Sequence, residues 1–142
     1  MSEWRRRAMK MIPYRAKTAE QASSLHVLWF DLLSDLQAAY RDRTALGDRI
    51  EPIWAFAAWC FDPKRNKTVR GAVAVSFYEH LAHFGPARRE LPQRITRAQF
   101  EELLPAFGTV LEDTEYDAFV AETLRGYGAK AGEIRRYRRA AT

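Results

Sequence analysis

The centre of the chain is an apolar run that is followed, after a turn, by a periodic segment. Residues 53–61, Ile-Trp-Ala-Phe-Ala-Ala-Trp-Cys-Phe, carry hardly a polar atom outside two indole groups. A run of this kind is compatible with a buried strand or with a helix that is covered on most sides. We predict a helix, because three of the nine residues are alanine and no second strand-like segment is available to pair with it.

The segment after the turn at 62–67 has the period of an α-helix. Its apolar and small residues recur at i, i+3, i+4, i+7, i+8, i+11, i+12 and i+15, which defines one helical face over four turns. They are Val69, Ala72, Val73, Ser76, Phe77, His80, Leu81 and Phe84. Gly85 and Pro86 are then expected to end the helix. The run and the periodic segment together predict an αα-hairpin at the centre of the fold.

Two threonines predict helix starts on either side of this hairpin. Thr18 and Thr96 are each followed three positions later by glutamine, which is the capping-box pattern. A leucine-rich helix is expected after Thr18. Val27 and Phe30 fall outside its apolar stripe, so we expect a second side of this helix to be covered in part. The helix after Thr96 is expected to be kinked or split at Pro105.

The fold class that follows is all-α. We predict a single compact domain of about five to six helices, packed as antiparallel hairpins in a HEAT-like or bundle-like way, although no recurring residue pattern marks a repeat. Charge divides the chain further. Residues 1–17 carry six Lys and Arg against one acidic residue, and residues 128–142 carry five against one, whereas residues 18–127 carry twelve against sixteen. We therefore predict a flexible basic leader that settles on the body near Ile12 and Tyr14, a helical domain and a flexible Arg-rich tail, with these three boundaries.

The basic termini are the candidate contacts for nucleic acid. Tyr137 lies among the arginines of the tail, and an aromatic side chain among arginines suits RNA or single-stranded DNA. The candidate residues are Arg5, Arg6, Arg7, Arg135, Arg136, Arg138 and Arg139. Two further basic loops, at 64–67 and 88–89, flank the central periodic segment. Arginine clusters of this size are also typical of solvated termini, and the acidic middle weakens the footprint expected of a nucleic-acid-binding protein.

Three residues of the central segment are the candidates for a metal or a catalytic site. Glu79, His80 and His83 are spaced so that pairs of them share a helical face. A metal site needs three or four converging ligands, and their order does not match the known His and Glu zinc helices. His80 also falls on the apolar stripe, which favours a structural histidine. A metal-dependent enzyme using these residues is retained as an alternative.

Other chemistry has less support in the sequence. Cys60 lies between Trp59 and Phe61, so we expect a buried and inert thiol. The seven glycines form no phosphate-binding loop. Three acidic residues, Asp31, Asp35 and Asp42, lie on roughly one side of the first long helix; acid–base work or a divalent ion is conceivable, but a solvated face explains them as well. We therefore predict no catalytic, cofactor-binding or metal-binding residue and no cofactor.

The sequence favours a small non-enzymatic helical interaction module, of the kind that bacteria use as adaptors, regulators or immunity-type proteins, with another protein as its partner. Nucleic-acid binding through the basic tails is the first alternative and the metal-dependent enzyme is the second. One cysteine and no apolar run of about 18 residues point to the cytoplasm and away from a membrane. The sequence does not specify an oligomeric state.

Overall fold

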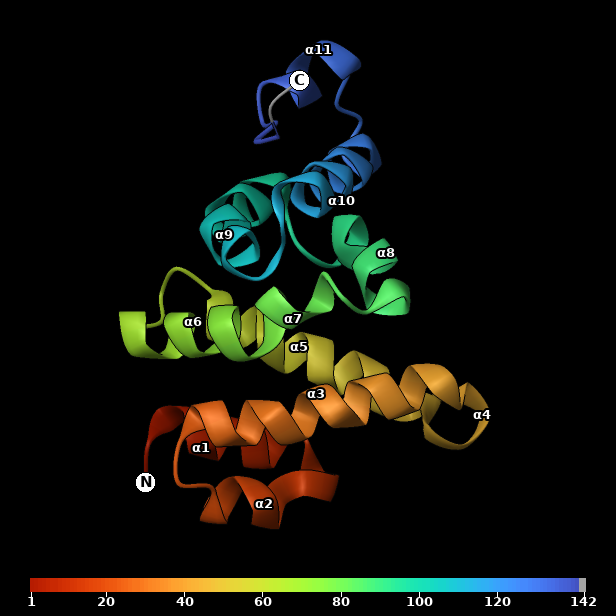
Figure 1. The fold of residues 1–142 in the computed structure, drawn as a ribbon. Coiled ribbons are helices and arrows are strands. Elements are labelled where there is room, and N and C mark those ends of the chain that lie inside the picture. Colours follow the sequence, from red (N-terminus) through yellow and green to blue (C-terminus); the bar gives the residue numbers. More distant parts are fainter. Residues whose placement is uncertain (141–142) are drawn as a thin grey trace. The chain divides into compact units, whose positions relative to one another are not determined.

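A computed structural model describes residues 1–140, and this part of the chain is all-α, without a strand. The chain divides into two units, residues 1–78 and residues from 79 onwards, which are described separately below. Figure 1 shows the helices in chain order. None of the helices in residues 1–140 combines the length and the apolar character that crossing a membrane requires.

Unit 1 is built around the long helix α3, which packs against α5, α6 and η3, while α1 packs against α2 and α5 (Figure 1). Its elements are α1 (Glu3–Met11), η1 (Pro13–Arg15), α2 (Ala16–Gln21), α3 (Leu25–Arg41), α4 (Arg43–Leu46), η2 (Gly47–Arg49), α5 (Ile50–Phe61), α6 (Lys67–Val73) and the π-helical segment η3 (Ala74–Tyr78). The apolar run at 53–61 is helical, as predicted.

An aromatic cluster fills the core of unit 1. The ring of Trp29 stacks on Phe56 with centroids 5.2 Å apart and lies 4.6 Å from Phe77. The buried indole N–H of Trp54 donates a hydrogen bond of 2.9 Å to the hydroxyl of Tyr40. Burial of a large aromatic side chain contributes about 1.5–3 kcal/mol, so this cluster is a main source of stability for the unit.

The predicted regular helix over 69–84 is wrong in detail. α6 passes into the π-helical η3, and the following α7 (Glu79–Leu81) ends three residues before Phe84. A π-turn inserts one extra residue and changes the direction of the side chains that follow it. Because of this change Ser76, Phe77 and Tyr78 are all buried although they are consecutive, which a regular α-helix on a core surface does not allow.

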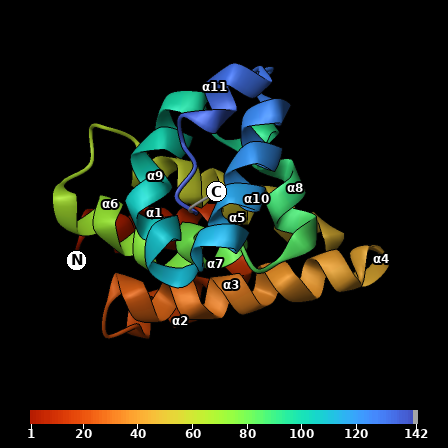
Figure 2. The ribbon, with the colours of Figure 1, turned by 45° about the horizontal axis from the view of Figure 1, so that its top comes forward.

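Unit 2 has a second aromatic core. It contains α7, α8 (Gly85–Arg94), α9 (Arg97–Val110), α10 (Asp113–Gly126) and α11 (Ala131–Arg135). α10 packs against α8, α9 and α11, and Figure 2 shows α9 and α10 side by side. The ring of Phe119 lies 4.7 Å from Phe107 and 5.7 Å from Phe100. These rings come from α9 and α10, so they join the two helices.

The chain contains more helices than the five to six predicted, and proline accounts for part of the difference. Gly85 and Pro86 begin α8 instead of ending a helix, because the first helical positions need no intrahelical N–H donor. Residues 87–94, which follow Pro86, are therefore helical. α9 continues across Pro105 without being split.

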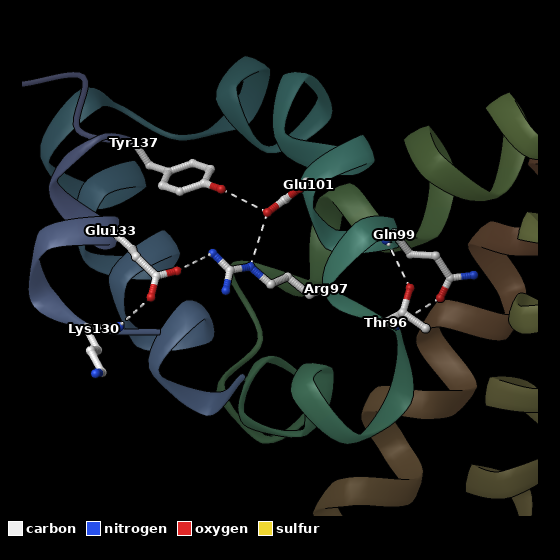
Figure 3. A network of polar contacts seen from close by, with 7 residues as sticks. All are labelled: Thr96, Arg97, Gln99, Glu101, Lys130, Glu133 and Tyr137. Carbon is white, nitrogen blue, oxygen red and sulfur yellow. Dashed lines mark hydrogen bonds and ion pairs between the residues drawn. The ribbon is translucent and has the colours of Figure 1, made fainter. Parts of the chain in front are cut away.

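The two predicted capping boxes have different outcomes. At Thr96 the box is complete, since its hydroxyl accepts from the Gln99 N–H at 3.1 Å and the Gln99 side chain accepts from the Thr96 N–H at 2.9 Å (Figure 3). Thr18, in contrast, lies inside α2. The cap of α3 is Ser24, whose hydroxyl accepts a 3.3 Å hydrogen bond from the Val27 N–H. The helix predicted after Thr18 thus begins later.

The termini, predicted to be flexible, are helical and packed. In the leader, α1 places Ala8 and Ile12 in the core of unit 1, with each only 1% exposed. The two residues are four positions apart and therefore share a helical face. In the tail, residues 131–135 form α11, which packs against α10. Buried apolar residues thus anchor the leader, whereas α11 has no buried residue.

Candidate binding surfaces

Arg5, a predicted nucleic-acid contact, is a structural residue. Its Nη1 donates hydrogen bonds to three backbone carbonyls, those of Ala19 at 2.7 Å, Glu20 at 2.9 Å and Ala22 at 2.8 Å. These carbonyls lie at the end of α2, where the last C=O groups of a helix lack intrahelical partners. Arg5 therefore caps α2 and is not available to a ligand.

Arg7 belongs to a basic cluster around Trp59. Its guanidinium carbon lies 5.4 Å from the centre of the Trp59 ring, and that of Arg65 lies 4.2 Å from the same ring. Arg65 also forms an ion pair of 2.9 Å with Glu3. The fold thus brings the basic stretch of α1 beside the loop at 62–67. We call this the Trp59 cluster; its exposed basic residues are Arg6, Arg7, Lys10, Lys64 and Lys67.

The net charge of the chain lies in unit 1. This unit holds thirteen Lys and Arg against eight Asp and Glu, which gives +5, whereas unit 2 holds ten of each. A positive field attracts polyanions over roughly a Debye length, about 8 Å at physiological salt. The overall field is therefore most positive on unit 1, whereas unit 2 carries no net charge as a whole.

The Arg-rich tail is attached to α9 by the network in Figure 3. Arg97 pairs with Glu101 at 3.2 Å and with Glu133 at 3.1 Å, and the Tyr137 hydroxyl donates a 2.8 Å hydrogen bond to Glu101. Hydrogen bonding to Arg97 holds the pKa of Glu133 below its usual range. Tyr137, predicted as a nucleic-acid contact among arginines, is thus engaged within unit 2.

Arg139 is also engaged, and it holds the end of the tail against α10. Its backbone N–H donates a 2.7 Å hydrogen bond to Asp117, and its Nε lies 3.5 Å from Asp113. Its guanidinium lies over the ring of Tyr116, at 4.6 Å from the ring centre. The other three C-terminal candidates are Arg135, Arg136 and Arg138, which are exposed and form no ion pair or side-chain hydrogen bond within residues 1–140.

Two of these free arginines line a pocket of about 490 Å³ between α10 and the tail. A third arginine of the lining, Arg125, was not a sequence candidate. It lies in the last turn of α10, and a single basic residue near a helix C-terminus is too common to be singled out. The structure therefore groups Arg125 with Arg135 and Arg138.

An apolar patch lies on α3 and η3 of unit 1. Val27 is 42% exposed, Phe30 is 53% exposed and Val75 is 49% exposed. Nδ1 of His26 lies 2.6 Å from the Ser76 hydroxyl, which places the neighbouring Val75 beside this turn of α3. The second side of α3 is thus covered only in part, as predicted: Asp35 is buried, whereas Val27 and Phe30 remain about half exposed. We call Val27, Phe30 and Val75 the α3 patch.

The histidines form no site with Glu79. Glu79 is buried, His80 is half-buried and His83 is exposed, and His26 contacts Ser76. Within residues 1–140 there is no group of three or more His, Cys, Asp or Glu side chains that could hold a metal ion. The structure therefore gives no set of converging ligands to which the metal-dependent alternative could be assigned.

Cys60 and Asp35 have structural surroundings. Burial raises the pKa of the Cys60 thiol, which disfavours a thiolate nucleophile. Asp35 is buried, contrary to the predicted solvated face; it accepts a 2.8 Å hydrogen bond from the Tyr14 hydroxyl and two of 2.8 Å from Arg15. Burial raises the pKa of Asp35, but these hydrogen bonds outweigh it, so the pKa lies below its usual value. Asp35 fastens η1 to α3.

Comparison with known proteins gives no relative: no protein-family model matches the chain, and no significant match is found among curated proteins or solved structures. The function must therefore be argued from the residues of this chain.

Proposed function

We propose that this chain is a small non-enzymatic interaction module that binds another protein. The observation that carries the proposal is the α3 patch. Val27 and Phe30 are apolar residues on a second side of a helix whose first side already faces the core, and they are about half exposed. Apolar residues on a side of a helix that its own fold leaves open are typical of a surface that a partner covers.

The surroundings of the patch suit a protein partner. His26 and Asp31 are the sequence neighbours of Val27 and Phe30 on α3, so polar residues adjoin the apolar ones along this helix. This arrangement is typical of protein–protein interfaces, in which an apolar anchor is surrounded by polar contacts that exclude water. Burying one phenylalanine contributes about 1.5–3 kcal/mol, so Phe30 is the expected anchor.

A type of role and a cellular location for the protein are also proposed. An adaptor, a regulator or an immunity-type protein would each act by binding alone, without the metal site that residues 1–140 also lack. The likeness to stacked helical hairpins belongs to the same proposal, since such folds present helix faces to partners. The cytoplasm is proposed as the location because the one cysteine is a buried free thiol.

The test is site-specific photo-crosslinking in the cells that make the protein. A photoreactive phenylalanine analogue at position 30 is expected to cross-link to one defined protein. The same analogue at Gln93, an exposed residue of α8, is the control and is expected not to. Equal cross-linking from both positions, or no product from position 30, would refute the α3 patch as the interface.

Nucleic-acid binding remains the second candidate, supported by the Trp59 cluster. Two basic segments meet there, in the unit that carries the whole net charge. Binding to a single-stranded RNA 12-mer, measured by fluorescence anisotropy, should then weaken steeply with salt. Replacing Arg7, Lys10 and Lys64 by glutamine should abolish it, whereas replacing Arg135, Arg136 and Arg138 should not. Equal losses in both triple variants would indicate general charge attraction without a site.

A further inference from the structure

We infer that the pocket between α10 and the C-terminal tail binds an acidic segment of a partner protein, one that carries an aliphatic side chain between its carboxylates. We call it the arginine pocket. Its volume is about 490 Å³, and its lining consists of Asp117, Ala118, Ala121, Arg125, Ala129, Ala131, Ile134, Arg135 and Arg138. A volume of this size holds a few side chains of a docked peptide. The inference goes beyond the α3 patch because it concerns a different surface, on unit 2.

The carboxylates near the pocket are already engaged, which leaves its arginines without partners. Asp117 accepts from the backbone N–H groups of Arg139 at 2.7 Å and Ala140 at 3.0 Å. Glu133 pairs with Arg97 at 3.1 Å, and Glu122 pairs with Arg88 at 2.6 Å. Glu133 and Glu122 are therefore paired with arginines outside the lining, whereas Asp117 lines the pocket and accepts hydrogen bonds from backbone N–H groups alone.

Three arginines then line the pocket together with a single acidic residue, Asp117, so the lining keeps an excess of positive charge. Arg125, Arg135 and Arg138 form no ion pair or side-chain hydrogen bond within residues 1–140. Placing three like charges around one pocket is unfavourable unless anions or water screen them. Carboxylates are well suited to this role because a guanidinium group binds them through two parallel hydrogen bonds.

The residues at the floor of the pocket favour an acidic peptide over RNA as the polyanionic partner. It consists of four alanines and Ile134, and no aromatic side chain lines it. Proteins that bind single-stranded nucleic acid stack the bases on aromatic rings, which this floor does not provide. Alanines let a partner approach the helix closely, and an aliphatic side chain would bury their methyl groups. An acidic peptide with an aliphatic residue therefore suits both the arginines and the apolar floor of the pocket. RNA suits only the arginines.

The position of the tail that forms the pocket is fixed by the fold. Gly128 has a φ of 85°, the left-handed region in which glycine is strongly favoured, and this turn ends α10. The Ala129 N–H donates a 3.0 Å hydrogen bond back to Leu124. The Tyr137–Glu101 and Arg97–Glu133 contacts then hold the rest of the tail (Figure 3). The backbone that carries the arginines is thus ordered by a turn and a network before binding, and the partner has to order only the exposed arginine side chains.

The experiment is a selection of random 12-residue peptides displayed on phage against the full-length chain. Peptides that also bind the triple variant with Arg125→Gln, Arg135→Gln and Arg138→Gln are removed. The recovered peptides are expected to contain Asp or Glu on either side of Leu, Ile or Val. A synthetic version should shift the methyl resonances of Ala118, Ala121 and Ile134, and should bind the triple variant at least tenfold more weakly.

Arg136→Gln is the matched control, because Arg136 is exposed on the same segment and does not line the pocket. An equal loss in this variant, or recovery of peptides without acidic residues, would overturn the inference. So would recovery of no peptide, or an RNA 12-mer or free glutarate that shifts the same methyl groups as strongly as the peptide does. Phe30→Ser should leave peptide binding unchanged, so this inference and the proposed function can fail separately.

Discussion

Replacing Asp35 by asparagine tests how the N-terminal segment is attached to unit 1. Asp35 accepts hydrogen bonds of 2.8 Å from Tyr14 and from two nitrogens of Arg15, and its side chain is 9% exposed. Hydrogen bonds that involve a charged group are worth about 1.5–3 kcal/mol, and an unpaired buried charge costs about 3–5 kcal/mol. The Arg15 side chain is 33% exposed, so water would compensate part of that loss.

We therefore expect Asp35→Asn to lower the free energy of unfolding by about 2 kcal/mol, which for a chain of this size corresponds to a fall in Tm of about 4–8 °C. Urea titration followed by circular dichroism measures the change. Asp48→Asn is the control; this exposed aspartate of η2 should give a change within about 0.5 kcal/mol. An Asp35→Asn variant as stable as the wild type would refute the assigned role.

The direction of the pKa shift of Asp35 determines how the stability contributed by this contact depends on pH. Because the folded-state pKa of Asp35 lies below that of the unfolded chain, its contribution to stability is complete above the unfolded value of about 4. It is lost as the pH falls through the folded-state pKa. The difference in stability between the wild type and Asp35→Asn should therefore shrink below about pH 4; a difference that is constant from pH 7 to pH 2 would contradict this.

Three further predictions concern other parts of the fold. Gly128→Ala, at a φ of 85°, should destabilise the chain by about 1 kcal/mol. Gly71→Ala, in helix α6 with open space around it, should stabilise the chain by about 0.5–1 kcal/mol. Equal effects of the two substitutions would contradict the turn geometry at Gly128. Thr96→Ala should cost about 1 kcal/mol in urea unfolding, and Thr18→Ala, inside α2, less than half of that. Burial raises the pKa of Tyr127 to about 12, so its phenol should ionise after exposed tyrosines in an absorbance titration, and the stability that it contributes should be lost as the pH rises from about 10 through 12.

Local signals account for the parts of the fold that the sequence predicts correctly. Residues 53–61 leave no polar face, so a buried helix follows once pairing strands are absent. The Thr96 capping box forms because all its atoms lie within one helical turn. Thr18 has the same pattern but lies inside α2, since Ser24 caps α3 and Arg5 caps the end of α2 from a distant part of the chain. A local pattern cannot reveal a competing partner of this kind.

Because local patterns do not reveal distant partners, the predictions for the basic ends and for residues 69–86 also contain errors. α1 is held by the buried Ala8 and by polar contacts of Glu3 and Arg5 with residues farther along the chain, and the basic composition of the leader does not reveal these partners. Residues 74–78 form the π-helical η3, whereas the sequence periodicity predicts a regular α-helix there. Gly85 and Pro86 are as suitable for a helix start as for a stop, so the sequence alone does not decide between them.

Some candidate site residues can be named from the sequence, whereas the role of others is visible only in the structure. Sequence reasoning names the exposed Arg135 and Arg138, but it also names Arg5 and Arg139, whose acceptors are supplied by folding. It omits Arg125, because the pocket exists only after the turn at Gly128 returns the chain to α10. Val27 and Phe30 were noticed as residues outside the apolar stripe; their exposure is visible only in the structure.

The central claim is that the α3 patch binds a protein, and the most direct test is the affinity for the protein cross-linked from position 30. The Kd of the purified wild type is compared with that of Phe30→Ser and of Gln93→Ser by calorimetry. Loss of one buried phenylalanine, about 1.5–3 kcal/mol, predicts a Kd roughly 10–100-fold higher for Phe30→Ser and no change for Gln93→Ser. An unchanged Kd for a folded Phe30→Ser variant would contradict the claim.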